Sequence, residues 1–141
     1  MGDIGIQLEL RYEDVPTWLK RIYHRYDFQM NLNYFYQLPD PVLGVHRHYG
    51  TDQIRKGTHF VNSSRYSNPK LDALLDSGAG EPNAAKRTAA YKEIQQILAN
   101  DMPVVNLFEL EFLVVYNTKL KGAYGSAMGA YSSFRDAYLD D

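Results

Sequence analysis

The chain has 141 residues, of which 45% are hydrophobic and 23% are charged, enough for one domain with a core and too apolar for an intrinsically disordered protein. The 15 Lys and Arg against 17 Asp and Glu give a formal net charge of -2, which supplies no general attraction to nucleic acid. There is no cysteine, which excludes disulfides and thiol chemistry, and neither a signal peptide nor a membrane span is predicted.

The N-terminal part is predicted to form a strand, a helix and a second extended segment. Apolar and polar residues alternate over residues 4–10, which is typical of a strand with one covered face. Asp14 stands where it would cap a helix over residues 17–26. Residues 28–36 are predicted to be extended, and the following LPDP stops any strand there. The helix is expected to bury one apolar stripe, formed by Trp18, Leu19, Ile22 and Tyr23.

Two helices dominate the middle of the chain, after a short helix expected over residues 43–49. Asn68 is the expected cap of a helix over 69–77, with Gly78 at its exit. Asn83 is the expected cap of a longer helix that runs to about residue 100. One face of that longer helix is expected to pack against a sheet, through Tyr91, Ile94, Ile97 and Leu98.

The end of the chain is predicted to return to strands. Pro103 stops the long helix, and strands are expected from Val104 onward and over residues 112–117. The tail after them mixes Gly, Ala and Ser with aromatic residues and allows no assignment. We therefore predict one α/β domain over residues 1–141, a mixed β-sheet covered by the helices at 17–26, 69–77 and 84–100.

Three stretches occur in the order DFQMNLNYFYQLPDP, VNSSRYSNPKLDALLDSG and NAAKRTAAYKEIQQILANDMPVVNL. In order and spacing they resemble the C-terminal part of the extracellular solute-binding proteins of family 5. These are the dipeptide-, oligopeptide- and nickel-binding subunits of bacterial ABC importers. The resemblance implies part of the C-terminal lobe of a type II periplasmic-binding-protein-like fold, a periplasmic location, and a cleft that closes on a small solute and hands it to an ABC permease.

The resemblance also implies where a solute would bind. In the peptide-binding members, an aspartate that holds the peptide ammonium and a pocket-lining aromatic residue stand at the positions of Gln37 and Tyr34 here. An amide carries no charge to balance an ammonium group, so Gln37 favours a neutral or anionic polar solute over a free-amine peptide. The predicted ligand-binding residues are completed by Tyr36 and, from a neighbouring loop, Asn62.

Other classes of function have less support in the sequence. The histidines at 24, 46, 48 and 59 include a pair two residues apart, which is a poor ligand set, so we expect surface or core histidines and neither a metal nor a cofactor. No nucleophile motif, phosphate loop or carboxylate pair indicates an enzyme. The alternative is a freestanding protein-interaction module derived from a truncated receptor. Because the first lobe would be missing, the strand at 4–10 is expected to be an open edge and the chain to form a homo-oligomer.

Overall fold

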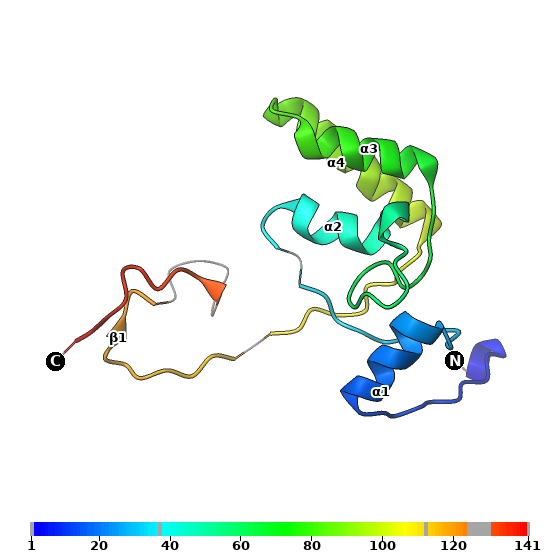
Figure 1. Cartoon of the computed structure of the whole chain (residues 1–141), viewed down its shortest axis with the longest axis horizontal. Coiled ribbons are helices and arrows are strands. Elements are labelled where there is room, and N and C mark those ends of the chain that lie inside the picture. Colours follow the sequence, from blue (N-terminus) through cyan, green and yellow to red (C-terminus); the bar gives the residue numbers. More distant parts are fainter. Residues whose placement is uncertain (1, 37, 112, 124–130, 141) are drawn as a thin grey trace.

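The computed structural model describes residues 2–36, 38–111, 113–123 and 131–140. Within them the chain forms α1 (Val15–Leu19), continued by the π-helical turn η2 (Lys20–Arg25), then α2 (Pro41–Tyr49), α3 (Pro69–Gly80) and α4 (Ala84–Asp101). Short 3₁₀ turns, η1 (Gly2–Ile4) and η3 (Thr51–Gln53), and the strands β1 (Leu120–Lys121) and β2 (Tyr138–Leu139) complete the elements. Figure 1 shows α3 and α4 side by side with α2 beneath them, while the segment that carries β1 extends away from the helices.

Three of the helices have the N-cap residue that the sequence predicts, although α1 begins at Val15 and not at residue 17, and α2 begins at Pro41 and not at residue 43. The carboxylate of Asp14 accepts the backbone N–H of Thr17, and the amide oxygen of Asn68 accepts those of Lys70 and Leu71. Asn83 accepts the N–H of Lys86 in the same way. These three predicted N-caps are confirmed, because each side chain satisfies a donor that the first helical turn leaves unpaired.

Two small apolar clusters hold the helical part together. Ile22 and Tyr23 of η2 pack with Val61, and Trp18, Leu19 and Phe28 surround them, so the predicted stripe of the first helix is confirmed. The second cluster joins α3 to α4 through Leu71, Leu75 and Ile94. The face of α4 was predicted to pack on a sheet, and that partner is wrong, because the opposing surface is the apolar stripe of α3.

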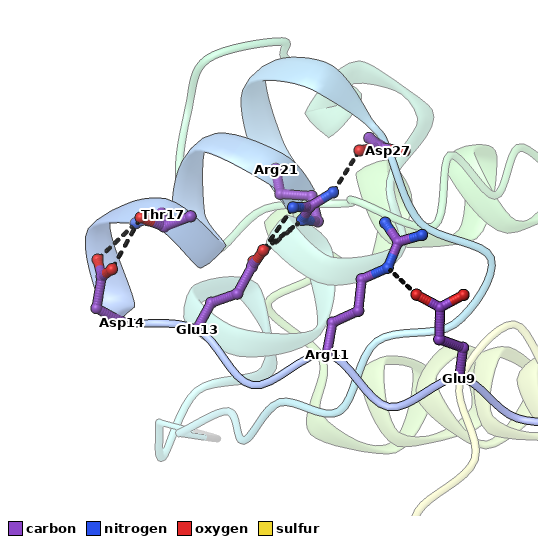
Figure 2. Close-up of polar contacts among 7 residues, drawn as sticks. All are labelled: Glu9, Arg11, Glu13, Asp14, Thr17, Arg21 and Asp27. Carbon is purple, nitrogen blue, oxygen red and sulfur yellow. Dashed lines mark hydrogen bonds and ion pairs between the residues drawn. The ribbon is translucent and has the colours of Figure 1, made fainter.

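An arginine fastens the chain on both sides of the first helix. Arg21 donates to both carboxylate oxygens of Glu13 before α1, with its Nε at 2.8 and 3.0 Å, and to Asp27 after η2. Figure 2 shows this guanidinium between the two carboxylates, with the Asp14 cap on Thr17 beside it and an exposed Glu9–Arg11 pair nearby. The extended segment that precedes α1 is therefore anchored at its end by charge-assisted hydrogen bonds.

The predicted strands do not form a sheet in the described residues. The sheet found there is the antiparallel pair β1–β2, with Leu120 opposite Leu139. Residues 6–10, 28–36, 105–111 and 113–117 have no strand pairing, and residue 112 of the last predicted strand lies outside the described residues. Many of the apolar side chains in these segments are exposed, among them Leu8, Leu10, Leu32 and Leu107. Alternation predicts an extended backbone, but a strand also needs a hydrogen-bonding neighbour, and the described part of the chain supplies none here. The wider predictions, one domain and the lobe of a type II binding-protein fold, stay predictions.

Candidate ligand-binding site

The two predicted ligand-binding tyrosines lie together, and a tyrosine that was not predicted joins them. The rings of Tyr34 and Tyr36 are 6.0 Å apart in an edge-to-face arrangement, and Tyr131 meets Tyr36 at 5.7 Å. We call these three residues the tyrosine cluster. Loss of solvation on burial, with the neighbouring Tyr131 second, raises the pKa of Tyr36, so its hydroxyl stays protonated at neutral pH. Tyr131 belongs to the C-terminal tail, for which the sequence allows no assignment. The aromatic residues that recur in this tail are the signal that could have pointed to it.

The end of α2 supports the segment that carries the cluster. The ring of Phe35, between the two tyrosines, lies 3.8 Å from the ring of His48, and Arg47 donates to the backbone carbonyl of Tyr36 at 3.2 Å. His48 is only 4% exposed. Burial, with the Arg47 charge second, lowers the pKa of His48 to about 4, which keeps the imidazole neutral against the Phe35 ring. These contacts attach the extended segment, which has no strand pairing in the described residues, to a helix.

The Asp-Pro loop contacts α2 and α4 directly and is linked to α3 through Arg87. Asp40 caps α2 by accepting the N–H of Val42, and both of its carboxylate oxygens accept from Arg87 of α4, at 2.8 and 3.0 Å. Arg87 also donates to the carbonyl of Gly78 in α3, at 3.1 Å. The pKa of Asp40 is lowered, first by the Val42 hydrogen bond and then by Arg87, so the carboxylate is ionised at neutral pH.

Beside this network lies a shallow groove of about 420 Å³. Its polar groups come from α4, and Tyr91 there contacts His46 of α2, with 3.2 Å between the hydroxyl and Nε2. The guanidinium of Arg87 lies 5.3 Å from the centre of the Tyr91 ring. The residues that line the groove are Pro41, Ala84, Arg87, Thr88, Tyr91, Lys92 and Gln95. The Asp-Pro loop was interpreted from sequence as a break, and the structure shows that it is also the N-terminus of α2.

The other two predicted ligand-binding residues are placed differently. Asn62 is 1% exposed, and its amide donates to the carbonyls of Gly50 and Tyr66 and accepts from Ser64. These contacts use both of its donors to close the loop between α2 and α3, which is a structural role. Gln37 lies outside the described residues. The prediction that Asn62 and Gln37 contact a solute stays a prediction.

The described part of the chain contains neither a metal-binding cluster of side chains nor a membrane-spanning helix. No cluster of three or more His, Asp or Glu side chains in residues 2–36, 38–111, 113–123 and 131–140 is arranged to hold a metal ion. Over the same ranges, no helix has the length and apolar character that crossing a membrane requires.

Comparison with known proteins gives local similarity to periplasmic binding proteins. The chain is 31% identical over 80 residues, 57% of its length, to the probable ABC transporter periplasmic-binding protein SapA of Escherichia coli. It is 23% identical over 70 residues, 50% of its length, to the peptide transport periplasmic protein SapA of Haemophilus influenzae. It is 35% identical over 66 residues, 47% of its length, to protein XP55 of Streptomyces lividans.

The matched part is a small share of each relative, between 12% and 14% of their lengths. No family model matches the chain, and no solved structure matches it. The similarity relates about half of the chain to the solute-binding proteins of ABC transporters, in agreement with the family resemblance noted in the sequence.

Proposed function

We propose that this chain contributes part of the solute-binding surface of a periplasmic receptor for an ABC-type importer. Its solute would be a small polar molecule, peptide-like or otherwise, which the receptor passes to a membrane permease. The local similarity to two SapA proteins, one named for peptide transport, supports this class of function. The receptor is a binding protein in this proposal and performs no catalysis.

The tyrosine cluster is the observation that carries the proposal. Tyrosine rings offer apolar faces together with a hydroxyl, the combination that lines many small-molecule sites. Tyr34 and Tyr36 stand directly before Gln37, where the family resemblance places the group that recognises the solute. The contacts from Arg47 and His48 hold this segment in place before any solute arrives.

The same proposal accounts for the extended segments that have no strand pairing in the described residues. In a lobe of the type II binding-protein fold, residues 6–10, 28–36 and 105–111 would be strands whose partners belong to other parts of a longer protein. Their exposed apolar side chains would then be covered by that sheet and its helices. The chain spans about one seventh of its SapA relative from E. coli, so most of such a partner surface would lie elsewhere.

A titration followed by two-dimensional NMR would test the proposal on the chain itself. A dipeptide and its N-acetylated form are the probes, and saturable shifts are expected at Tyr34, Tyr36 and Tyr131. The affinity should be weak, with a Kd of about 1 mM, since one lobe supplies part of the contacts and no closure. Tyr36→Ala should abolish the shifts, whereas Tyr12→Ala, which removes an exposed tyrosine before α1, should not. Shifts that do not saturate, or that persist in Tyr36→Ala, would refute the proposal.

The amide at Gln37 makes the choice of probe informative. The acetylated dipeptide should bind at least as well as the free amine, because a neutral amide gives no charge compensation for an ammonium group. Gln37→Asp should reverse that order. Tighter binding of the free amine to the unmodified chain would contradict the assignment of a neutral or anionic solute while leaving the location of the site intact.

A freestanding protein-interaction module is the second candidate function. It is favoured by the exposed apolar residues of the extended segments, which monomeric proteins seldom leave uncovered in a large patch. The NMR titration separates the two candidates, because an interaction module has no reason to bind a dipeptide at the tyrosine cluster.

A further inference from the structure

Two histidines that are far apart in the sequence meet at the surface. The Nε2 atoms of His24, in the last turn of η2, and His59, in the loop before Val61, are 3.1 Å apart although 35 positions separate the residues. Both side chains are exposed, so solvent and ions reach them. Neither residue belongs to the tyrosine cluster or to the Asp40–Arg87 network.

The backbone around the pair is held by contacts of its own. The N–H of Gly57, two residues before His59, donates to the carbonyl of Tyr23 at 2.8 Å, which ties the loop to η2 next to His24. The His59 ring also lies 5.8 Å from the ring of the buried Tyr23. Gly57 has a φ of +87°, a conformation that glycine adopts without strain. The two imidazoles are therefore brought together by packed and hydrogen-bonded chain.

The separation of the two nitrogens fits shared coordination of one metal ion. With metal–nitrogen bonds of about 2.0–2.1 Å and coordination angles between square and tetrahedral, two ligand nitrogens stand about 2.9–3.4 Å apart. The observed 3.1 Å falls within that interval. In the absence of metal the same spacing is a hydrogen bond from one Nε2–H to the other Nε2. A metal ion takes the place of that proton, and the donor imidazole adopts its Nδ1–H tautomer.

We propose that His24 and His59 form a two-histidine surface site for a divalent transition-metal ion of the zinc or copper type. The imidazole ligands select this class, because Mg²⁺ and Ca²⁺ prefer oxygen donors. No third His, Asp or Glu joins the pair within the described ranges, so water completes the coordination and the ion exchanges readily.

Calorimetric titration of the chain with ZnCl₂, and with MgCl₂ for comparison, tests the site. One Zn²⁺ per chain is expected, with no uptake of Mg²⁺. His24→Ala and His59→Ala should each weaken zinc binding by roughly tenfold or more, since one imidazole alone loses the chelate. His46→Gln is the matched control, because His46 contacts Tyr91 and is expected to leave zinc binding unchanged. Circular dichroism confirms that each variant is folded.

Copper provides a second readout that does not depend on affinity alone. The electron paramagnetic resonance spectrum of the Cu²⁺-loaded chain should show hyperfine coupling to two equivalent nitrogens, reduced to one in either single variant. The proposal is overturned if Zn²⁺ is not taken up below about 1 mM, or if both single variants bind it as well as the unmodified chain.

Discussion

Replacing Ile94 by alanine should remove a large part of the stability that joins α3 to α4. Ile94 is 1% exposed and packs on Leu71 and Leu75, with Tyr91 and Leu98 at the margin of the cluster. The substitution deletes three carbon atoms, which corresponds to about 2.4 kcal/mol of lost transfer free energy at about 0.8 kcal/mol per group. A residual cavity adds to that cost, and the range for such truncations is about 2–5 kcal/mol. We expect about 3 kcal/mol.

Urea titration followed by far-ultraviolet circular dichroism measures this loss, because the helices supply the signal. The control is Leu43→Ala, since Leu43 also lies on a helix but is 55% exposed, and its truncation should cost less than about 0.5 kcal/mol. A loss below about 0.5 kcal/mol for Ile94→Ala, or equal losses for the two variants, would mean that the α3–α4 contact does not stabilise the folded chain.

Three further predictions concern the loop, the pH dependence and the assembly state. Asp40→Asn keeps an N-cap on α2 but loses the charge pair with Arg87, whereas Asp40→Ala loses both. The Tm should therefore fall less in Asp40→Asn than in Asp40→Ala. Equal Tm values for the two variants would argue that the cap contributes nothing. Burial holds the pKa of His48 in the folded state at about 4, below the unfolded value of about 6.5, so the unfolded chain binds the extra proton first. Stability should therefore be complete above pH 6.5 and fall by up to about 3 kcal/mol as the pH drops toward 4. The pKa of His46 is also lowered by burial, so His46 adds to the same dependence of stability on pH. In urea titrations His48→Gln should therefore flatten the profile of stability against pH only in part. An unchanged profile would contradict the role given to His48. Finally, the extended segments without strand pairing expose backbone edges on which a second copy can pair. Light scattering after size exclusion at tens of micromolar should therefore give a mass that rises above 16.2 kDa with concentration. A constant monomer mass would refute self-association.

The features predicted correctly from sequence are those that depend on neighbouring residues. Asn68 followed by Pro69 specifies the start of a helix. The side-chain oxygen of Asn68 accepts from the first turn, and Pro69 has no backbone N–H that would need a partner there, so both effects act within a single turn. The same chemistry occurs at Asp40 and Pro41, yet the short helix was predicted to begin at residue 43 because the prolines were interpreted as a break. The signal for the earlier start was present and local.

The features that sequence reasoning missed depend on which distant segments meet. Arg87 and Asp40 are 47 residues apart, and the residues next to each of them in the sequence do not indicate that the two pair. The helix that follows Asn68 was predicted to cover residues 69–77, with Gly78 at its exit, whereas α3 continues to Gly80. Gly78 has a different use there, since a Cβ at this position would lie 3.3 Å from the Tyr91 ring, closer than most such contacts. Its lack of a side chain lets α4 approach α3.

The candidate solute site follows the same division between local and distant effects. The resemblance indicated Tyr34 from its position before the Asp-Pro loop, and Tyr36 was predicted beside it. The groups that hold this segment, His48 and Arg47, come from the far end of α2. Asp40 fixes the near end of that helix by pairing with Arg87 on α4. The position of the tyrosines is thus set by the helices, through both ends of α2, although the segment that bears them pairs with no strand in the described residues. A site supported from one side in this way needs a second surface to enclose a solute, which is the arrangement that a two-lobed receptor provides.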